Sequence, residues 1–472
     1  MTSPRSRFRD VLPPVIVVLI GGAAYFTGIV QLIPIAIALA LFSVVVSSQS
    51  SALAAAFASI VLPLSYLDLP GALRVLQPFV VLPLLVFALR GRLRIPNWLG
   101  LGPIVVGAAF VAYSSIVAAT TPFGPPEAAL VWVVSLAVAF VVVPSCSGVA
   151  FDVRPILAVL AVLSCIYGLV AILEFTTRSN ALSGFFAASP VGLSQKWDAY
   201  RSMTSIGHPL LNGTVFAVCA SGGLSALLQT GRLRWLVVTG IPLLAVFTTG
   251  SRSAVLACVA GSSVAILCLL LSRARGPRGR AFVAVIAGAV VLAVAGSGFL
   301  VESGRGVVEA SGSAQLRFDY LQLLAPLVAI SNGLGTGAGL SHSALLAVGG
   351  AYAQYPLESS ALQALVSLGV PGFSLLVIAV GWIMIASARR GAVIGPAMFA
   401  AYVVAASGFN LLEAFPAALV IPMTALSLSI MEAQSFGREP DATPGPHLIP
   451  GATRRGVRLR AGLPARPEGE ML

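Results

Sequence analysis

Apolar runs of about 20 residues follow one another along most of this chain, separated by short polar segments. A run of this length crosses the hydrocarbon core of a bilayer as an α-helix, whose backbone hydrogen bonds are all internal. Of the 472 residues, 58% are apolar and only 9% are charged, which is not the composition of a soluble globular domain. The runs are continuous rather than alternating, which excludes a β-barrel. The sequence therefore predicts an all-α integral membrane protein, a polytopic bundle with a large extracytoplasmic loop.

The apolar runs predict about fourteen transmembrane spans. The first run is long and another follows it at once, so we expect a transmembrane span and not a cleaved signal peptide. Merging or splitting one pair of short spans would change the count. The expected spans are residues 11–30, 31–47, 51–67, 72–89, 99–118, 127–145, 155–174, 209–229, 235–250, 252–272, 281–300, 359–386, 392–409 and 414–432.

The basic residues predict the orientation. An even number of spans places both termini on one side, and a cytoplasmic N-terminus puts 21 of the 28 Lys and Arg in cytoplasmic segments. We therefore expect both termini in the cytoplasm. The net charge of +12 follows from these loops and the tail, so it does not indicate nucleic-acid binding. The seven basic residues expected on the outer face are Arg74, Arg178, Lys196, Arg201, Arg252, Arg305 and Arg317.

Two outer segments are long, at about 175–208 and 301–358, whereas the cytoplasmic loops are short and basic. Long polar outer loops indicate work at that face, although such a loop can also be a simple cover. We expect a transmembrane domain at 1–436 and a disordered, basic cytoplasmic tail at 437–472, rich in Pro, Gly and Arg. The five cysteines show neither a disulfide nor a zinc pattern, and we interpret them as apolar packing residues.

Arg252 lies in Thr249-Gly-Ser-Arg-Ser253, a break between two apolar runs. A cation at the bilayer centre costs about 2.5–3.5 kcal/mol, so an arginine at the membrane edge among small residues needs a reason. Arg252 either reaches lipid phosphate at a helix end or binds an anion where two helices meet the outer face. Arg201 and His208 lie at the same expected lip of the membrane. His208 precedes Pro209, a favoured first helical residue, and can equally be a cap.

The larger outer loop contains four further candidate residues. Residues 314–327 place Leu316, Tyr320, Leu323 and Leu327 on one stripe, which predicts a helix on the membrane surface. Arg317 and Asp319 lie off that stripe, as site residues or as a solvated ion pair of little energetic consequence. The glycines of 332–340 follow no strand, so we interpret them as a permissive turn and not as a dinucleotide-binding loop. We expect Pro356 to open a helix with Glu358 in its first turn, as a dipole-stabilised carboxylate or as a base. His342 is a weaker candidate base.

These residue types suit the transfer of a glycan from a polyprenyl diphosphate. The departing diphosphate gains charge in the transition state, and arginine forks match its oxygens. The expected outer face has no Asp-x-Asp pair to hold a metal, so Arg201, Arg252 and Arg317 are the candidate clamp and no cofactor is expected. Glu358 or a histidine can take the proton of the acceptor hydroxyl.

The same residues, over about 195–385, resemble the O-antigen ligase and O-antigen polymerase family. Thr249-Gly-Ser-Arg-Ser253 is similar to the family's Thr-x-Ser-Arg-Gly/Ser signature, and the 201–212 stretch is similar to its Arg…Gly…His/Asn-Pro-Asn approach to a span, with Leu210 in place of the Asn. Arg317 with the glycine-rich 332–339 run, and Glu358 with the Leu and Gly residues after it, are similar to two further segments. Glu358 stands where the ligases have His. A Glu at this position is more similar to the polymerases of the family.

The resemblance implies a metal-independent, inverting glycosyltransferase of the bacterial cytoplasmic membrane. Its partners would be a polyprenyl-diphosphate-linked glycan donor, a glycan or lipid acceptor, and membrane lipids. It implies that Arg252 and Arg317 bind the diphosphate with the help of Arg201. Two alternatives stay open: a flippase for lipid-linked oligosaccharides, which needs cations midway through the bundle, and a solute transporter, which is expected to show inverted repeats of broken helices.

Overall fold

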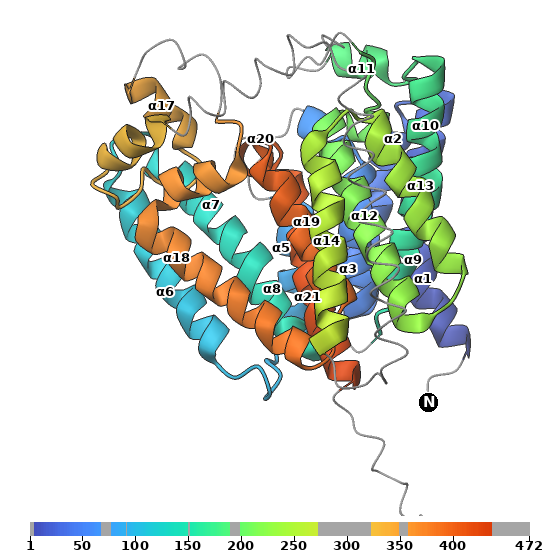
Figure 1. The fold of residues 1–472 in the computed structure, drawn as a ribbon, viewed down its shortest axis with the longest axis horizontal. Helices are drawn as coiled ribbons and strands as arrows, with labels where there is room; N and C mark the ends of the chain where they lie inside the picture. The colour runs from blue at the N-terminus through green and yellow to red at the C-terminus, as the bar shows by residue number, and fades with distance from the viewer. Residues whose placement is uncertain are drawn as a thin grey trace, which may run out of the picture. The chain divides into compact units, whose positions relative to one another are not determined.

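All of the secondary structure that the structure describes is helical (Figure 1). The computed structural model describes residues 4–67, 77–90, 92–149, 152–188, 199–271, 322–348 and 357–436. These residues all fall within one compact unit, residues 1–437. The predicted tail at 437–472 and the predicted span at 281–300 lie outside the described residues.

Eight helical segments in the described part of the chain are long and apolar enough to cross a membrane. They confirm the predicted fold class, and the number of spans stays a prediction. These segments are α1 (Pro4–Thr27), α6 (Gly102–Thr120), α7–η3–α8 (Pro126–Cys146), α9–η5–α10 (Arg154–Thr177), α12 (Pro209–Thr230), α14 (Arg252–Leu271), α18 (Ser360–Arg389) and η8–α21 (Pro416–Phe436).

Five shorter apolar helices correspond to the other predicted spans that are described. The prediction of one continuous span at 51–67 was wrong. Its α-helix ends at Ala58, and 3₁₀ turns follow at Ser59–Val61 and Leu64–Tyr66. Pro63 explains the break, because it disfavours helical geometry in the residue before it, and Leu62 is extended. The shorter helices are α2 (Leu32–Val46), α3 with η1 (Gln49–Val61), α5 (Pro78–Leu89), α13 (Arg234–Thr248) and α19 (Ile394–Ser407).

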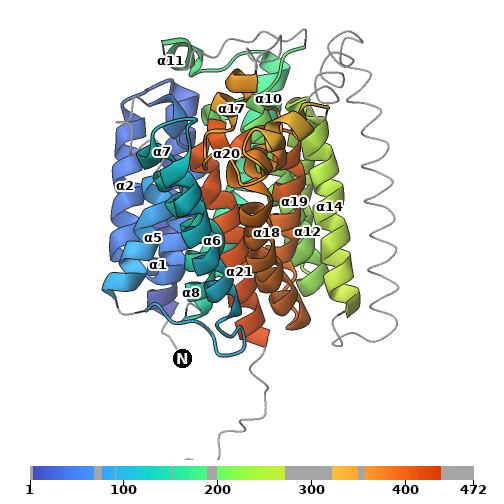
Figure 2. The same cartoon turned by 90° about the vertical axis from the view of Figure 1, so that its left-hand side faces the viewer.

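Helices α12 and α21 form the interior of the bundle, and their apolar surfaces are buried nearly all round. Helix α12 packs on α13, α14 and α19 (Figure 1), and α21 packs on α18 and α19 (Figure 2). Small residues allow these close approaches. A β-carbon placed on Gly261 of α14 would lie 2.2 Å from the Oγ of Ser221 in α12, so only glycine permits that spacing.

Several helix ends and short helices lie together at one end of the bundle. We call it the distal end, because it lies opposite the N-terminus of α1 (Figure 1). Helices α10 (Gly168–Thr177) and α13 end there, and α12, α14 and α18 begin there. The short helices α11 (Ser183–Ala188), α17 (Ser341–Val348) and α20 (Leu411–Ala414) lie at the same end.

The glycine-rich segment 332–340 docks on a break in α18. Gly369 has φ +68° and interrupts the helix, which leaves carbonyls of the preceding turn without their helical donors. The amides of Thr336 and Gly337 donate to the carbonyls of Val366 and Ser367 at 3.1 and 3.0 Å. Buried backbone groups in a membrane protein need such internal partners. All four glycines of the segment have positive φ, which confirms the predicted permissive turn.

The described half of the predicted surface helix packs on the protein. Residues 322–329 are helical, and Leu323 and Leu327 contact a buried cluster that includes Leu345 of α17 and Val366 of α18. Leu316, Arg317, Asp319 and Tyr320 lie outside the described residues. The five cysteines are free thiols, as the sequence predicted, and Cys165 alone among them is more than slightly exposed.

Candidate functional site at the distal end

Arg201 lies on an irregular segment, residues 199–204, that leads into α12 and is buried from Arg201 onward. Its side chain is only 4% exposed. The next residue fixes the segment to the end of α13: the Ser202 amide donates to the carbonyl of Thr248 at 2.9 Å, and the two hydroxyls are 2.6 Å apart. The Asn212 amide group of α12 donates to the Ser202 carbonyl at 3.2 Å. Arg201 is therefore held between two helices.

The turn between α13 and α14 brings Arg252 to the same place. Gly250 has φ +60°, and a β-carbon there would lie 3.3 Å from the Nε of Arg201. The stem of Arg201 thus packs on the turn that carries Arg252 two residues later. The Ser251 hydroxyl caps α14 by accepting from the Ala254 amide at 3.2 Å, so Arg252 is the first helical residue.

An arginine at this position opposes the helix dipole, which favours anions at a helix N-terminus by about 0.3–1 kcal/mol. The amides at the start of α14 carry positive potential, and Arg201 packs on the turn that precedes this helix. This combination is the one that binds phosphate at helix N-termini. The anion-binding role of Arg252 stays a prediction.

His208 is the N-cap of α12 and lies near Arg201. Its Nδ1 accepts from the Leu210 amide at 3.3 Å, so the proton of the neutral ring lies on Nε2. The ring stacks on Phe409 at 4.7 Å and lies 4.9 Å from Phe415. Burial and the positive charge of Arg201 lower the pKa of His208 to about 3. The predicted cap is confirmed, and the ring is uncharged at neutral pH.

Glu358 is not in the first turn of α18, contrary to the prediction. The helix begins at Ser360, and Ser359 is its N-cap with a hydroxyl that accepts from the Leu362 amide at 3.4 Å. Serine satisfies a first-turn amide without a charge, and Glu358 lies at a bend before the helix. The Ser360 amide and hydroxyl both donate to the carbonyl of Phe409, at 3.0 and 2.8 Å. Phe409 also stacks on His208, so these contacts connect the start of α18 with the start of α12.

Sequence reasoning missed Glu413, which joins three elements at this end. From α20 its carboxylate accepts from the hydroxyls of Ser341 and Ser367, at 2.7 and 2.9 Å, and from the Ser341 amide at 3.4 Å. Burial raises the pKa of Glu413, and these three hydrogen bonds oppose the rise. His342, the weaker candidate base, follows Ser341 on α17 and is exposed. Glu413 thus fixes the position of the helix that carries His342.

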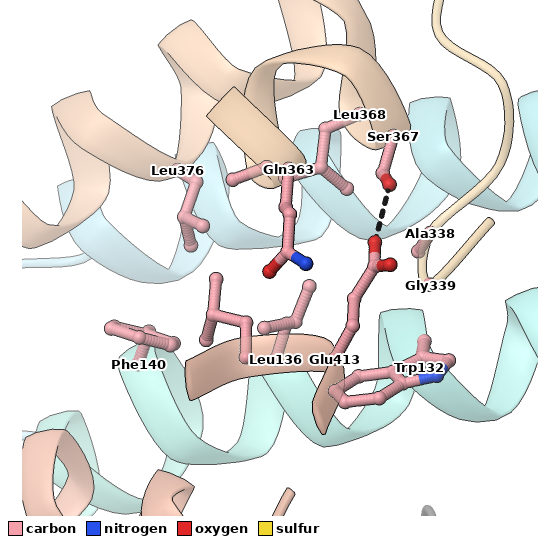
Figure 3. Close-up of a pocket in the computed structure, with 12 residues that line it drawn as sticks. Trp132, Leu136, Phe140, Ala338, Gly339, Gln363, Ser367, Leu368, Leu376 and Glu413 are labelled. Carbon is pink, nitrogen blue, oxygen red and sulfur yellow. Dashed lines mark hydrogen bonds between the residues drawn. The ribbon is translucent and has the colours of Figure 1, made fainter. Parts of the chain in front are cut away.

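Glu413 also lines a small cavity together with Gln363 and Trp132 (Figure 3). The cavity has a volume of about 40 Å³, enough for about three or four water molecules at roughly 10–15 Å³ each. It is far too small for a sugar. We therefore assign Glu413 to the architecture of the site and not to substrate binding.

The structure packs Arg201 on the turn that carries Arg252 and places His208 near Arg201. Glu358 lies two residues before Ser360, which is bonded to Phe409. His342 lies on a separate short helix, and Arg317 and Asp319 lie outside the described residues. Among the described residues, no group of three or more His, Cys, Asp or Glu side chains could hold a metal ion.

The fold and this site define a class, an α-helical membrane protein with a cationic site where several helices begin and end. Residues 235–377 match the protein-family model described as O-Antigen ligase. The match supports assignment to the O-antigen ligase and polymerase family and confirms the predicted resemblance. It includes Arg252, His342 and Glu358, whereas Arg201 and His208 precede it. Comparisons with curated proteins and with solved structures gave no match.

Proposed function

We propose that the protein is a membrane glycosyltransferase that moves or polymerises a polyprenyl-diphosphate-linked glycan onto an acceptor hydroxyl. The reaction takes place at the distal end of the bundle, which we assign to the outer face of the bacterial cytoplasmic membrane, with both termini in the cytoplasm. The observation that carries the proposal is the packing of Arg201 on the turn that presents Arg252 at the start of α14. The family match supports the reaction class.

In the proposed reaction the acceptor oxygen attacks the anomeric carbon of the donor from the face opposite the diphosphate. The new C–O bond forms with inversion while the old C–O bond breaks, and the diphosphate leaves with the electron pair. Arg252 and Arg201 bind its oxygens as their charge grows, with Arg317 as a third ligand in the proposal. The acceptor proton passes to Glu358, whose carboxylate precedes α18. His208 stays uncharged and can donate from Nε2.

The arginines supply the charge that a divalent cation supplies in other phosphoryl and glycosyl transferases, so we propose a metal-independent reaction. A flippase would need cations along a path through the bundle. Arg201 and Arg252 instead lie together at one end, and this placement favours transfer over transport.

The test uses the full-length protein in nanodiscs, with the lipid-linked precursor that accumulates in a strain lacking the gene. Arg252→Ala and Arg252→Lys should each lower transfer at least about 100-fold, the typical effect of removing one preorganised transition-state donor. Arg234→Ala is the matched control, because Arg234 is also the first residue of its helix, α13, and is at the opposite end of the bundle. Transfer should persist in EDTA.

Retained transfer by both Arg252 variants would overturn the proposed function. An equal loss in the Arg234 control would show that the effect is one of folding. Loss of transfer in EDTA, restored by Mg²⁺, would overturn the metal-independent part alone.

A further inference from the structure

Glu174 is a buried carboxylate that accepts hydrogen bonds from the segment that carries Arg201. It has no role in the proposed reaction. It is in the last turn of α10 and is 1% exposed. Its two oxygens accept five hydrogen bonds: from the amides of Met203 and Thr204 at 2.9 and 2.7 Å, and from the side chains of Asn180, Tyr200 and Tyr25 at 3.1 Å each. A buried carboxylate with so many donors is well satisfied.

Three of the five donors flank Arg201 on the same segment. Tyr200 precedes Arg201 directly, and Met203 and Thr204 follow it by two and three residues. Ser202, between them, is fixed to Thr248 of α13. Glu174 therefore fixes the segment through one set of hydrogen bonds and Thr248 of α13 fixes it through another. Together they determine where the Arg201 side chain points.

The segment needs this support because its backbone is strained. Thr204 has φ +50°, and a β-branched residue in the left-handed region is a genuine outlier. The Thr204 carbonyl accepts from Asn180 at 3.1 Å, and the same Asn180 amide group donates to Glu174. Strain of this kind persists where surrounding contacts over-determine the conformation, and it gathers at functional sites.

We propose that Glu174 is a positioning residue for diphosphate binding, which orients Arg201 toward the diphosphate of the lipid-linked donor. This inference rests on the proposed function. A carboxylate is required because both of its oxygens accept from backbone amides, one from Met203 and the other from Thr204. Glutamine has the same shape, but its NH₂ group would face one of these amides, which cannot reverse its role.

The test measures binding of undecaprenyl diphosphate, without a glycan, to the full-length protein in nanodiscs. Glu174→Gln should raise its Kd at least about tenfold, and kcat/KM for the donor should fall in proportion. The matched control is Glu432→Gln. Glu432 is also buried, and its two oxygens also accept from two backbone amides, those of Ile394 and Gly395, but on α19 away from Arg201. Both variants should lose similar stability, and only Glu174→Gln should lose diphosphate binding.

A milder pair keeps the test decisive if Glu174→Gln does not fold. Tyr200→Phe and Tyr25→Phe each remove one 3.1 Å bond to the same carboxylate, but only Tyr200 is on the Arg201 segment. Tyr200→Phe should raise the Kd severalfold more than Tyr25→Phe.

Wild-type diphosphate binding by Glu174→Gln, or equal effects within either pair, would overturn the positioning role. The proposed function would survive these results if Arg201→Ala and Arg252→Ala still abolish binding. If neither arginine variant changes the Kd, the proposed function itself fails.

Discussion

Gly250 is the position where a single methyl group tests whether the turn and Arg201 work together. Its φ of +60° costs an L-residue about 1–2 kcal/mol. The lower entropy of the unfolded alanine chain offsets about 0.4–1 kcal/mol of that cost. Gly250→Ala should therefore reduce the free energy of unfolding by about 1 kcal/mol through the backbone alone.

The new β-carbon would also lie 3.3 Å from Nε and 3.5 Å from Cδ of Arg201, so that side chain must move by a few tenths of an ångström. A hydrogen bond to a charged group contributes about 1.5–3 kcal/mol, and losing about 1 kcal/mol of it corresponds to roughly a fivefold change. We expect Gly250→Ala to lower kcat/KM for the lipid-linked donor by about fivefold or more.

Gly231→Ala separates the two effects. Gly231 has φ +67°, nearly the same backbone conformation, and a β-carbon there meets no atom within 4 Å. It caps α12, away from the site. Unfolding in mixed micelles should show equal losses of stability in the two variants. Turnover in nanodiscs should fall in Gly250→Ala alone. Equal losses of activity would refute the reasoning.

Two further predictions concern the ionisable groups of the site. The pKa of His208 is about 3 in the folded protein, below its ordinary value of 6.5. The unfolded chain therefore binds the extra proton as pH falls below about 6.5, and stability decreases by up to about 1.4 kcal/mol per pH unit down to the folded pKa. His208→Gln should lessen this loss between pH 6.5 and 5 in unfolding titrations, and an unchanged slope would contradict a ring that stays neutral. Glu358→Gln should reduce kcat at least about 100-fold with little change in the Kd for undecaprenyl diphosphate, because a base acts on the acceptor. An unaltered turnover would remove Glu358 from the reaction.

The fold class could be predicted from the sequence because hydropathy over about 20 residues depends on composition alone. The helix ends were harder where side chains decide them. Glu358 was expected in the first turn of α18, but Ser359 takes the capping position and Glu358 precedes it. A Glu-Ser-Ser sequence offers several caps, and the choice depends on which hydroxyl reaches the amide of Leu362.

The site could be predicted in part. The sequence shows that Arg252 follows a Gly-Ser break between two apolar runs. It also shows that Arg201 precedes the span at 209–229. Their packing through Gly250 depends on α13 returning to the start of α12, and hydropathy carries no such information. One signal was present and unused: Glu174 interrupts an apolar run, and an ionisable residue within a span is a functional hypothesis by default. Glu413 gave no such signal, because it lies in a short polar break between two spans.

The buried carboxylates share one physical task. Glu174 accepts from two backbone amides, Glu432 accepts from two others at the start of α19, and Glu413 accepts from the amide of Ser341. Each of these amides lies outside a helix interior or in a first helical turn, where it has no helical partner and little access to water. The bonds described for Glu174 all come from uncharged donors. These three buried carboxylates thus satisfy irregular backbone where the helices begin or break.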